Sequence, residues 1–146
     1  MRILIIALFI SVSTSTFAQK HLLDAEIGFS TISLAASYEG FISDHFSLGA
    51  KLGFVTLGAE GNYYLKSIAN DQWNAHVGLG YELTAAWPIT AAIWGPTVMV
   101  GVEHIFNGGL LIGLEGGVMF ATYGDTADYN RNQLYPMINL RLGRIF

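Results

Sequence analysis

The chain has 146 residues, room for one domain; 52% are apolar, 12% are charged and the formal net charge is −4. So much apolar surface excludes a disordered chain, because it would not remain in water. The excess of acids and the lack of a basic cluster argue against a nucleic-acid partner. The absence of cysteine excludes disulfides, thiolate metal sites and a cysteine nucleophile.

The first 18 residues have the pattern of a secretory signal peptide. Arg2 is followed by a short apolar run, a Ser/Thr-rich stretch, and the small residues Thr16 and Ala18 at positions −3 and −1. We therefore expect cleavage after Ala18 and a single domain over residues 19–146. The alternative, a membrane-anchoring helix, is disfavoured because the apolar run is too short to span a bilayer easily.

The rest of the sequence alternates between apolar and polar residues with period two, which is typical of β-strands, and helical spacing is absent. Residues 73–87 show this best, with apolar side chains at odd positions and polar residues or glycine at most even ones. The predicted strands are residues 24–30, 33–39, 46–54, 57–65, 73–87, 98–106, 110–120 and 138–146. Plain connections are predicted at residues 43–45, 66–72, 88–96, 107–109 and 124–133.

Two further boundaries carry no strong turn signal. The apolar phase switches from odd to even positions near Thr31 and switches back near Thr56. A regular strand cannot change face, so each switch means either a chain reversal or a β-bulge. Two reversals give eight strands.

The polar face of these strands carries the charge. It holds all six glutamates of the chain together with Lys51 and Arg141, among many glycines. A soluble secreted barrel of the lipocalin or avidin type would explain the alternation, but not a glycine-rich outer face with so few charges. An inside-out barrel explains both, because bulky apolar side chains then contact lipid while small and charged ones fill the interior.

Lipid requires every backbone polar group to be paired, and without helices only a closed barrel achieves this. The sequence therefore predicts an all-β fold, a closed eight-stranded antiparallel transmembrane β-barrel with meander topology. Its interior is just wide enough for side chains, so we expect a buried polar network instead of a diffusion pore. The members of this lumen network are Glu39, Lys51, Glu60, His76, Glu82, Glu103, Glu115 and Arg141.

No catalytic, metal or cofactor site is predicted. His76 and Glu82 share a face but lie about 20 Å apart along a strand, too far to act together. The histidines show no spacing suited to a metal, and no Gly-x-Ser-x-Gly element occurs. Trp73 and Trp87, on one face near opposite ends of their strand, are expected in the two aromatic girdles of a membrane barrel. The most polar loop, with Asp125, Asp128, Tyr129 and Arg131, is the expected surface-contact loop.

The last nine residues carry the most specific family signal. An alternating strand that ends in an aromatic residue resembles the C-terminal assembly signal of small outer-membrane β-barrel proteins of Gram-negative bacteria. The residues read by the insertion machinery would be Ile138, Leu140, Leu142 and Phe146. Arg144 departs from the pattern, which prefers an apolar residue there. Cleavage before Gln19 and the segment at residues 41–49 are similar to barrel proteins of the Bacteroidota type.

The resemblance implies an outer-membrane location with both termini periplasmic. It also implies contact with outer-membrane lipid and lipopolysaccharide, and with the barrel-assembly machinery and periplasmic chaperones during biogenesis. We expect a monomeric, non-catalytic protein with a structural or surface-interaction role: envelope integrity, adhesion or host contact. A narrow channel for small or hydrophobic molecules is the first alternative, and a lipid A-modifying enzyme is the second.

Overall fold

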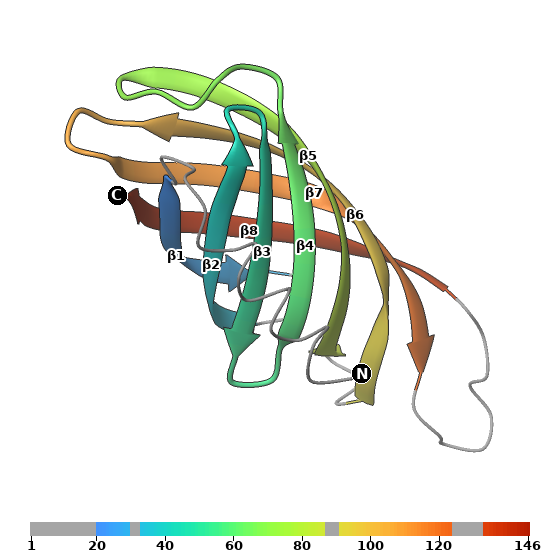
Figure 1. Cartoon of the computed structure of the whole chain (residues 1–146). Helices are drawn as coiled ribbons and strands as arrows, with labels where there is room; N and C mark the ends of the chain where they lie inside the picture. Colours follow the sequence, from blue (N-terminus) through green and yellow to red (C-terminus); the bar gives the residue numbers. More distant parts are fainter. Residues whose placement is uncertain (1–19, 30–32, 87–90, 124–132) are drawn as a thin grey trace, which may run out of the picture.

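A computed structural model describes residues 20–29, 33–86, 91–123 and 133–146, and these form a closed barrel of eight antiparallel strands (Figure 1). The strands are β1 (His21–Gly28), β2 (Ser33–Ser43), β3 (Phe46–Gly53), β4 (Leu57–Tyr64), β5 (Gln72–Ala86), β6 (Ala91–Ile105), β7 (Leu110–Tyr123) and β8 (Gln133–Ile145). Each strand pairs with the next in sequence, and β8 returns to pair with β1. The predicted meander of eight strands is confirmed.

The two faces of the wall differ in the way the alternation predicted. Along β1 the burial of successive residues alternates, with Asp24 and Glu26 buried and Leu23 and Ile27 exposed. The other strands follow the same rule, so the carboxylates point into the lumen and the large apolar side chains point outward. In the described residues, no helix is long and apolar enough to cross a membrane.

Both switches of apolar phase are chain reversals. At the second, the Gly53 amide donates a hydrogen bond of 2.7 Å to the Thr56 carbonyl, which closes the hairpin between β3 and β4. At the first, β1 and β2 pair antiparallel with Gly28 opposite Ser33, although residues 30–32 are outside the described part of the chain.

The predicted connection at residues 88–96 is wrong from Ala91 onward, because β6 begins there. Prolines at both ends suggested a loop there. Pro96 lies opposite Tyr81 of β5, while the ladder from β6 to β7 is interrupted at residues 95–96. Pro96 has no N–H to donate, and it stands where β6 forms no ladder with its neighbour β7. Strands tolerate proline at such positions.

The structure also extends four other predicted strands: β1 begins at His21, β2 runs to Ser43, β7 runs to Tyr123, and β8 begins at Gln133, five residues before Ile138. The side of the wall formed by β5–β8 is consequently longer than the side formed by β1–β4. These strands have 13 to 15 residues, compared with 8 to 11 in β1–β4.

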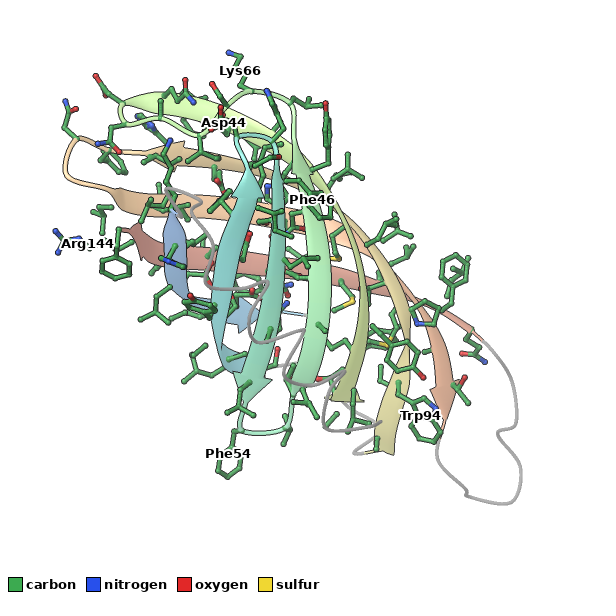
Figure 2. All side chains as sticks on the ribbon, in the orientation of Figure 1. Asp44, Phe46, Phe54, Lys66, Trp94 and Arg144 are labelled. Carbon is green, nitrogen blue, oxygen red and sulfur yellow. The ribbon has the colours of Figure 1, made fainter. Side chains whose placement is uncertain are left out.

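The two ends of the barrel are named here after residues labelled in Figure 2. The Lys66 end carries the connections β2–β3, β4–β5 and β6–β7, with Asp44 and Lys66 in the first two. The Phe54 end carries the hairpin between β3 and β4, whose tip residue Phe54 is 97% exposed. Relative to β4, β5 is longer at both ends of the barrel: Tyr64 pairs with His76 and Leu57 with Leu83, whereas β5 runs from Gln72 to Ala86 (Figure 1).

The outward orientation can be tested at Leu114. This residue lies in the middle of β7, between Val102 and Leu140 of the neighbouring strands, and is 56% exposed. We expect Leu114→Arg to lower the free energy of unfolding in lipid vesicles by about 2–4 kcal/mol, because it places a charge in hydrocarbon. The control is Asn107→Arg in the exposed β6–β7 turn, which should cost little. Equal losses in urea titrations would contradict the orientation.

Candidate functional site

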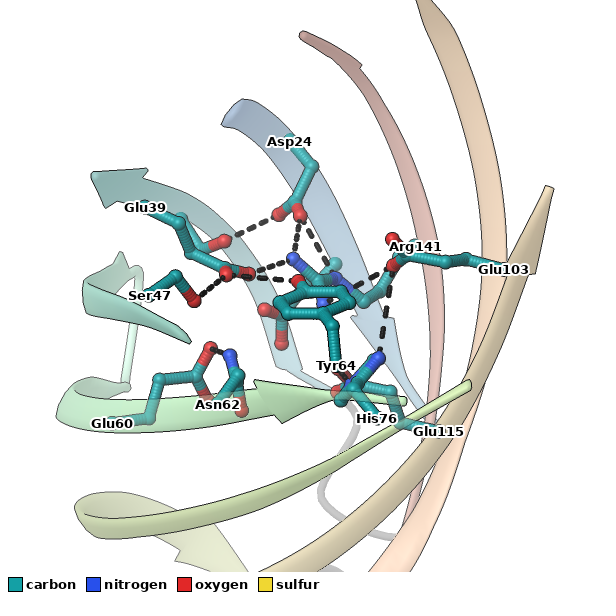
Figure 3. Close-up of polar contacts among 12 residues, drawn as sticks. Asp24, Glu39, Ser47, Glu60, Asn62, Tyr64, His76, Glu103, Glu115 and Arg141 are labelled. Carbon is teal, nitrogen blue, oxygen red and sulfur yellow. Dashed lines mark hydrogen bonds and ion pairs between the residues drawn. The ribbon is translucent and has the colours of Figure 1, made fainter. Parts of the chain in front are cut away.

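The lumen is organised around Arg141 of β8, whose side chain is completely buried (Figure 3). Its Nε donates to Asp24 Oδ2 at 2.8 Å, and its Nη1 donates to Glu115 Oε1 at 2.8 Å. Its Nη2 donates to both Asp24 and Glu39. These carboxylates come from β1, β2 and β7, so a single guanidinium joins four strands across the interior.

Hydroxyl groups hold two of these carboxylates in place. Ser37 donates a hydrogen bond of 2.5 Å to Asp24, and Ser47 donates one of 2.6 Å to Glu39. The Tyr64 hydroxyl also donates to Glu39, at 3.0 Å. In each case the hydroxyl binds the carboxylate oxygen that Arg141 does not contact. This fixes the orientation of both carboxylates, so the guanidinium meets a preorganised acceptor set.

His76 of β5 joins the network from the opposite wall. Its Nε2 lies 3.0 Å from Glu115 Oε1, and its Nδ1 lies 3.8 Å from Glu103 Oε2. Gly101 of β6 stands directly across the strand ladder, and a Cβ there would overlap the imidazole ring. The glycines of the inner face therefore leave the volume that the large polar side chains fill.

Lys51 of β3 forms a second, smaller centre nearer the Phe54 end. Its Nζ lies 2.5 Å from Glu26 Oε2 and 3.6 Å from Glu82 Oε2. Gly58 of β4 stands between Lys51 and Glu82 in the same row of the sheet. Glu60 accepts a hydrogen bond of 3.1 Å from Asn62.

Acids outnumber bases in the described lumen. The inward acids are Asp24, Glu26, Glu39, Glu60, Glu82, Glu103 and Glu115, while the inward bases are Lys51, Arg141 and His76. Both carboxylate oxygens of Glu103 are buried without a hydrogen-bond partner, although one lies 3.8 Å from Arg141 Nη1. No group of three or more His, Asp or Glu side chains in the described residues is placed to hold a metal ion.

Apolar side chains occupy the lumen on both sides of the charges. At the Lys66 end the buried cluster consists of Leu22, Phe41, Tyr64, Ile68, Ile105 and Leu111. Towards the Phe54 end it consists of Ile93, Met99, Met119, Ala121 and Met137. Ile68 comes from the β4–β5 connection, which folds over the mouth of the barrel and leaves this residue 2% exposed. The polar network thus lies between two apolar plugs.

The eight side chains predicted for the lumen network all lie on the inner face, and ion pairs join six of them into the Arg141 and Lys51 centres. His76 contacts this network, and Glu60 has its hydrogen bond to Asn62. The prediction omitted Asp24, Glu26, Ser37, Ser47 and Tyr64, although their positions in the alternation also point inward. The alternation could have found them, since it assigns the face of every strand residue.

The remaining predicted residues divide between the outer surface and undescribed segments. Trp73 is 60% exposed and stacks on His104 with ring centroids 5.0 Å apart. Ile138, Leu142 and Phe146 are exposed on β8 and at its end, and Leu140 is half-buried. Trp87, Asp125, Asp128, Tyr129 and Arg131 lie outside the described residues.

Removal of the central cation should be costly. We expect Arg141→Leu to lower the free energy of unfolding by about 3–5 kcal/mol, because several buried carboxylates lose their counter-charge. Adding Asp24→Asn and Glu39→Gln should recover part of this loss, since fewer charges are then uncompensated. The control is Lys66→Gln on the exposed surface, expected to change stability by no more than about 0.5 kcal/mol. Urea unfolding in vesicles measures all three, and a neutral effect of Arg141→Leu would refute the role of this centre.

Comparison with known proteins shows the fold. No family model matches the chain, and no curated protein matches its sequence. Among solved structures, the N-terminal β-barrel domain of Pseudomonas aeruginosa OprF is similar with a TM-score of 0.52 and 13% sequence identity. The match covers 88% of this chain and 96% of that domain. The chain therefore has the fold of an outer-membrane eight-stranded β-barrel.

Proposed function

We propose that this protein is an integral outer-membrane β-barrel, monomeric and non-catalytic, with a structural or surface-interaction role such as envelope integrity, adhesion or host contact. Both termini would lie in the periplasm. The observation that carries this proposal is the inversion of the barrel: the carboxylates of the strands, with Lys51 and Arg141, lie in the lumen, while all eight strands expose large apolar side chains on the outer surface.

The outer surface is unsuited to water. All eight strands contribute exposed large apolar residues, among them Leu52 at 68%, Leu79 at 64% and Val100 at 58%. Soluble monomers rarely expose apolar patches larger than a few hundred square ångströms. The outward face of every strand here continues such a patch around the barrel, and hydrocarbon is the solvent that makes it favourable.

The filled interior supports a structural role over transport. Ion pairs bridge the middle of the lumen, and buried apolar side chains lie on both sides of them. The same geometry speaks against catalysis by the buried His76–Glu115 pair. The hydroxyls of Ser37 and Ser47 donate hydrogen bonds to Asp24 and Glu39, and neither bond involves the histidine.

Membrane insertion can be tested with a hydrophobic photoreactive probe dissolved in the bilayer. Outward residues such as Leu79, Val100 and Ile112 should be labelled, whereas the inward Glu82 and Glu115 should not. The folded protein should also fractionate with outer membranes and change mobility on an unheated gel. Recovery as a soluble periplasmic species, or labelling of the two glutamates, would refute the proposal.

Transport can be tested in a planar bilayer. We expect no discrete conductance steps from the purified protein, because the apolar plug at the Lys66 end closes the lumen. The comparison variant combines Leu22→Ser with Ile105→Ser, which makes this plug polar and the lumen more prone to conduct. Regular conductance steps from the unmodified protein would favour the narrow-channel alternative, and altered lipid A masses on expression would favour an enzyme.

A further inference from the structure

Arg144 is a basic residue on the outward face of β8. Leu142 and Phe146, two positions before and after it, also point outward, and its paired neighbours are Leu110 of β7 and Leu23 of β1. All four of these apolar residues are exposed. Within the described residues the Arg144 side chain forms no hydrogen bond and no ion pair, in contrast to Arg141, three positions earlier inside the lumen.

Polar side chains of β1 and β2 share the outer surface with Arg144. Tyr38 of β2 is in the same row of the sheet, since Leu23 pairs with both Tyr38 and Arg144. The Tyr38 hydroxyl lies 2.6 Å from His21 Nδ1, and the two rings stack at 5.6 Å. We name Arg144, Tyr38 and His21 the seam patch, because they lie on the outer surface at the junction of β8 and β1 and on the adjoining β2.

The seam patch has a basic character. The acids of β1 and β2, namely Asp24, Glu26 and Glu39, all point into the lumen. The exposed acids at the Lys66 end, Asp44 and Asp71, belong to the β2–β3 and β4–β5 connections. The outward side chains of β8, β1 and β2 therefore include bases and a phenol but no carboxylate, so no side chain there neutralises the guanidinium.

We propose that the seam patch binds the phosphate of an anionic glycerophospholipid, with Arg144 as the principal ligand. This inference rests on the proposed function, which puts the Lys66 end in the phospholipid leaflet that faces the periplasm. A guanidinium pairs with a phosphate through two parallel hydrogen bonds. Tyrosine and imidazole groups suit the boundary between hydrocarbon and headgroups, and Leu23, Leu110 and Leu142 offer apolar contacts to the acyl chains.

The proposal explains why a charged residue is tolerated near the end of the last strand. An unpaired guanidinium on the lipid side of a barrel is costly in hydrocarbon, and the cost decreases towards the interface. Arg144 lies one residue before the end of β8 at Ile145. At that level a headgroup phosphate becomes available as its counter-ion.

The test compares phosphatidylglycerol with phosphatidylcholine of the same acyl chains, titrated onto the full-length folded protein and followed by native mass spectrometry. We expect phosphatidylglycerol to bind more tightly, and Arg144→Gln to reduce this preference about fivefold, the effect of one basic residue near an anionic membrane surface. Arg144→Lys should retain part of the preference. Tyr38→Phe, which keeps the ring, should weaken it more modestly and serves if Arg144→Gln does not fold.

The matched control is Lys66→Gln, which removes another exposed base at the same end but away from the seam patch. An unchanged preference in both Arg144→Gln and Tyr38→Phe would overturn the inference, and so would an equal loss in Lys66→Gln, which would indicate diffuse charge. Loss of the preference in millimolar inorganic phosphate would indicate a general anion site and would also overturn it. Failure of the unmodified protein to insert into vesicles would instead refute the proposed function.

Discussion

Seven residue pairs join β1 to β8, and their main-chain hydrogen bonds remove the last two free edges from the sheet. A bilayer offers no other partner for backbone amides and carbonyls, so closure is the condition under which this sequence can expose so much apolar surface. Because the barrel closes with only eight strands, its interior is narrow. The contents of the lumen follow from that width.

The same junction assembles the charge network. Asp24 and Arg141 are 117 positions apart in the sequence, yet they meet because β1 and β8 are neighbours. A narrow interior brings carboxylates of β1, β2 and β7 within reach of one guanidinium on β8, and glycines such as Gly101 free the volume that the lumen side chains require. The large polar side chains therefore fit in the lumen because small residues stand beside them, and apolar side chains fill the lumen at either end.

Much of this arrangement could be predicted from the period-two pattern, because alternation assigns each strand residue to a face. It predicts that Glu115 and Arg141 point inward, and it reveals reversals near Thr31 and Thr56 through the change of phase. Alternation does not contain the register between strands, so it could not predict which carboxylates Arg141 contacts. It also gave no means of recognising Pro96 as a strand residue, because that depends on a local interruption of the ladder to β7.

The unequal strand lengths have a consequence for the surrounding membrane. At about 3.3 Å per residue and a tilt of roughly 40°, eight residues rise about 20 Å, less than the ~25 Å apolar band of such barrels. The tip of the β3–β4 hairpin is itself apolar, with Phe54 and Val55 both exposed. A bilayer around this molecule would have to be thinner beside β3 and β4 than beside β6, or the barrel axis would have to lean. The membrane would then be thinned on one flank of the protein only, beside β3 and β4.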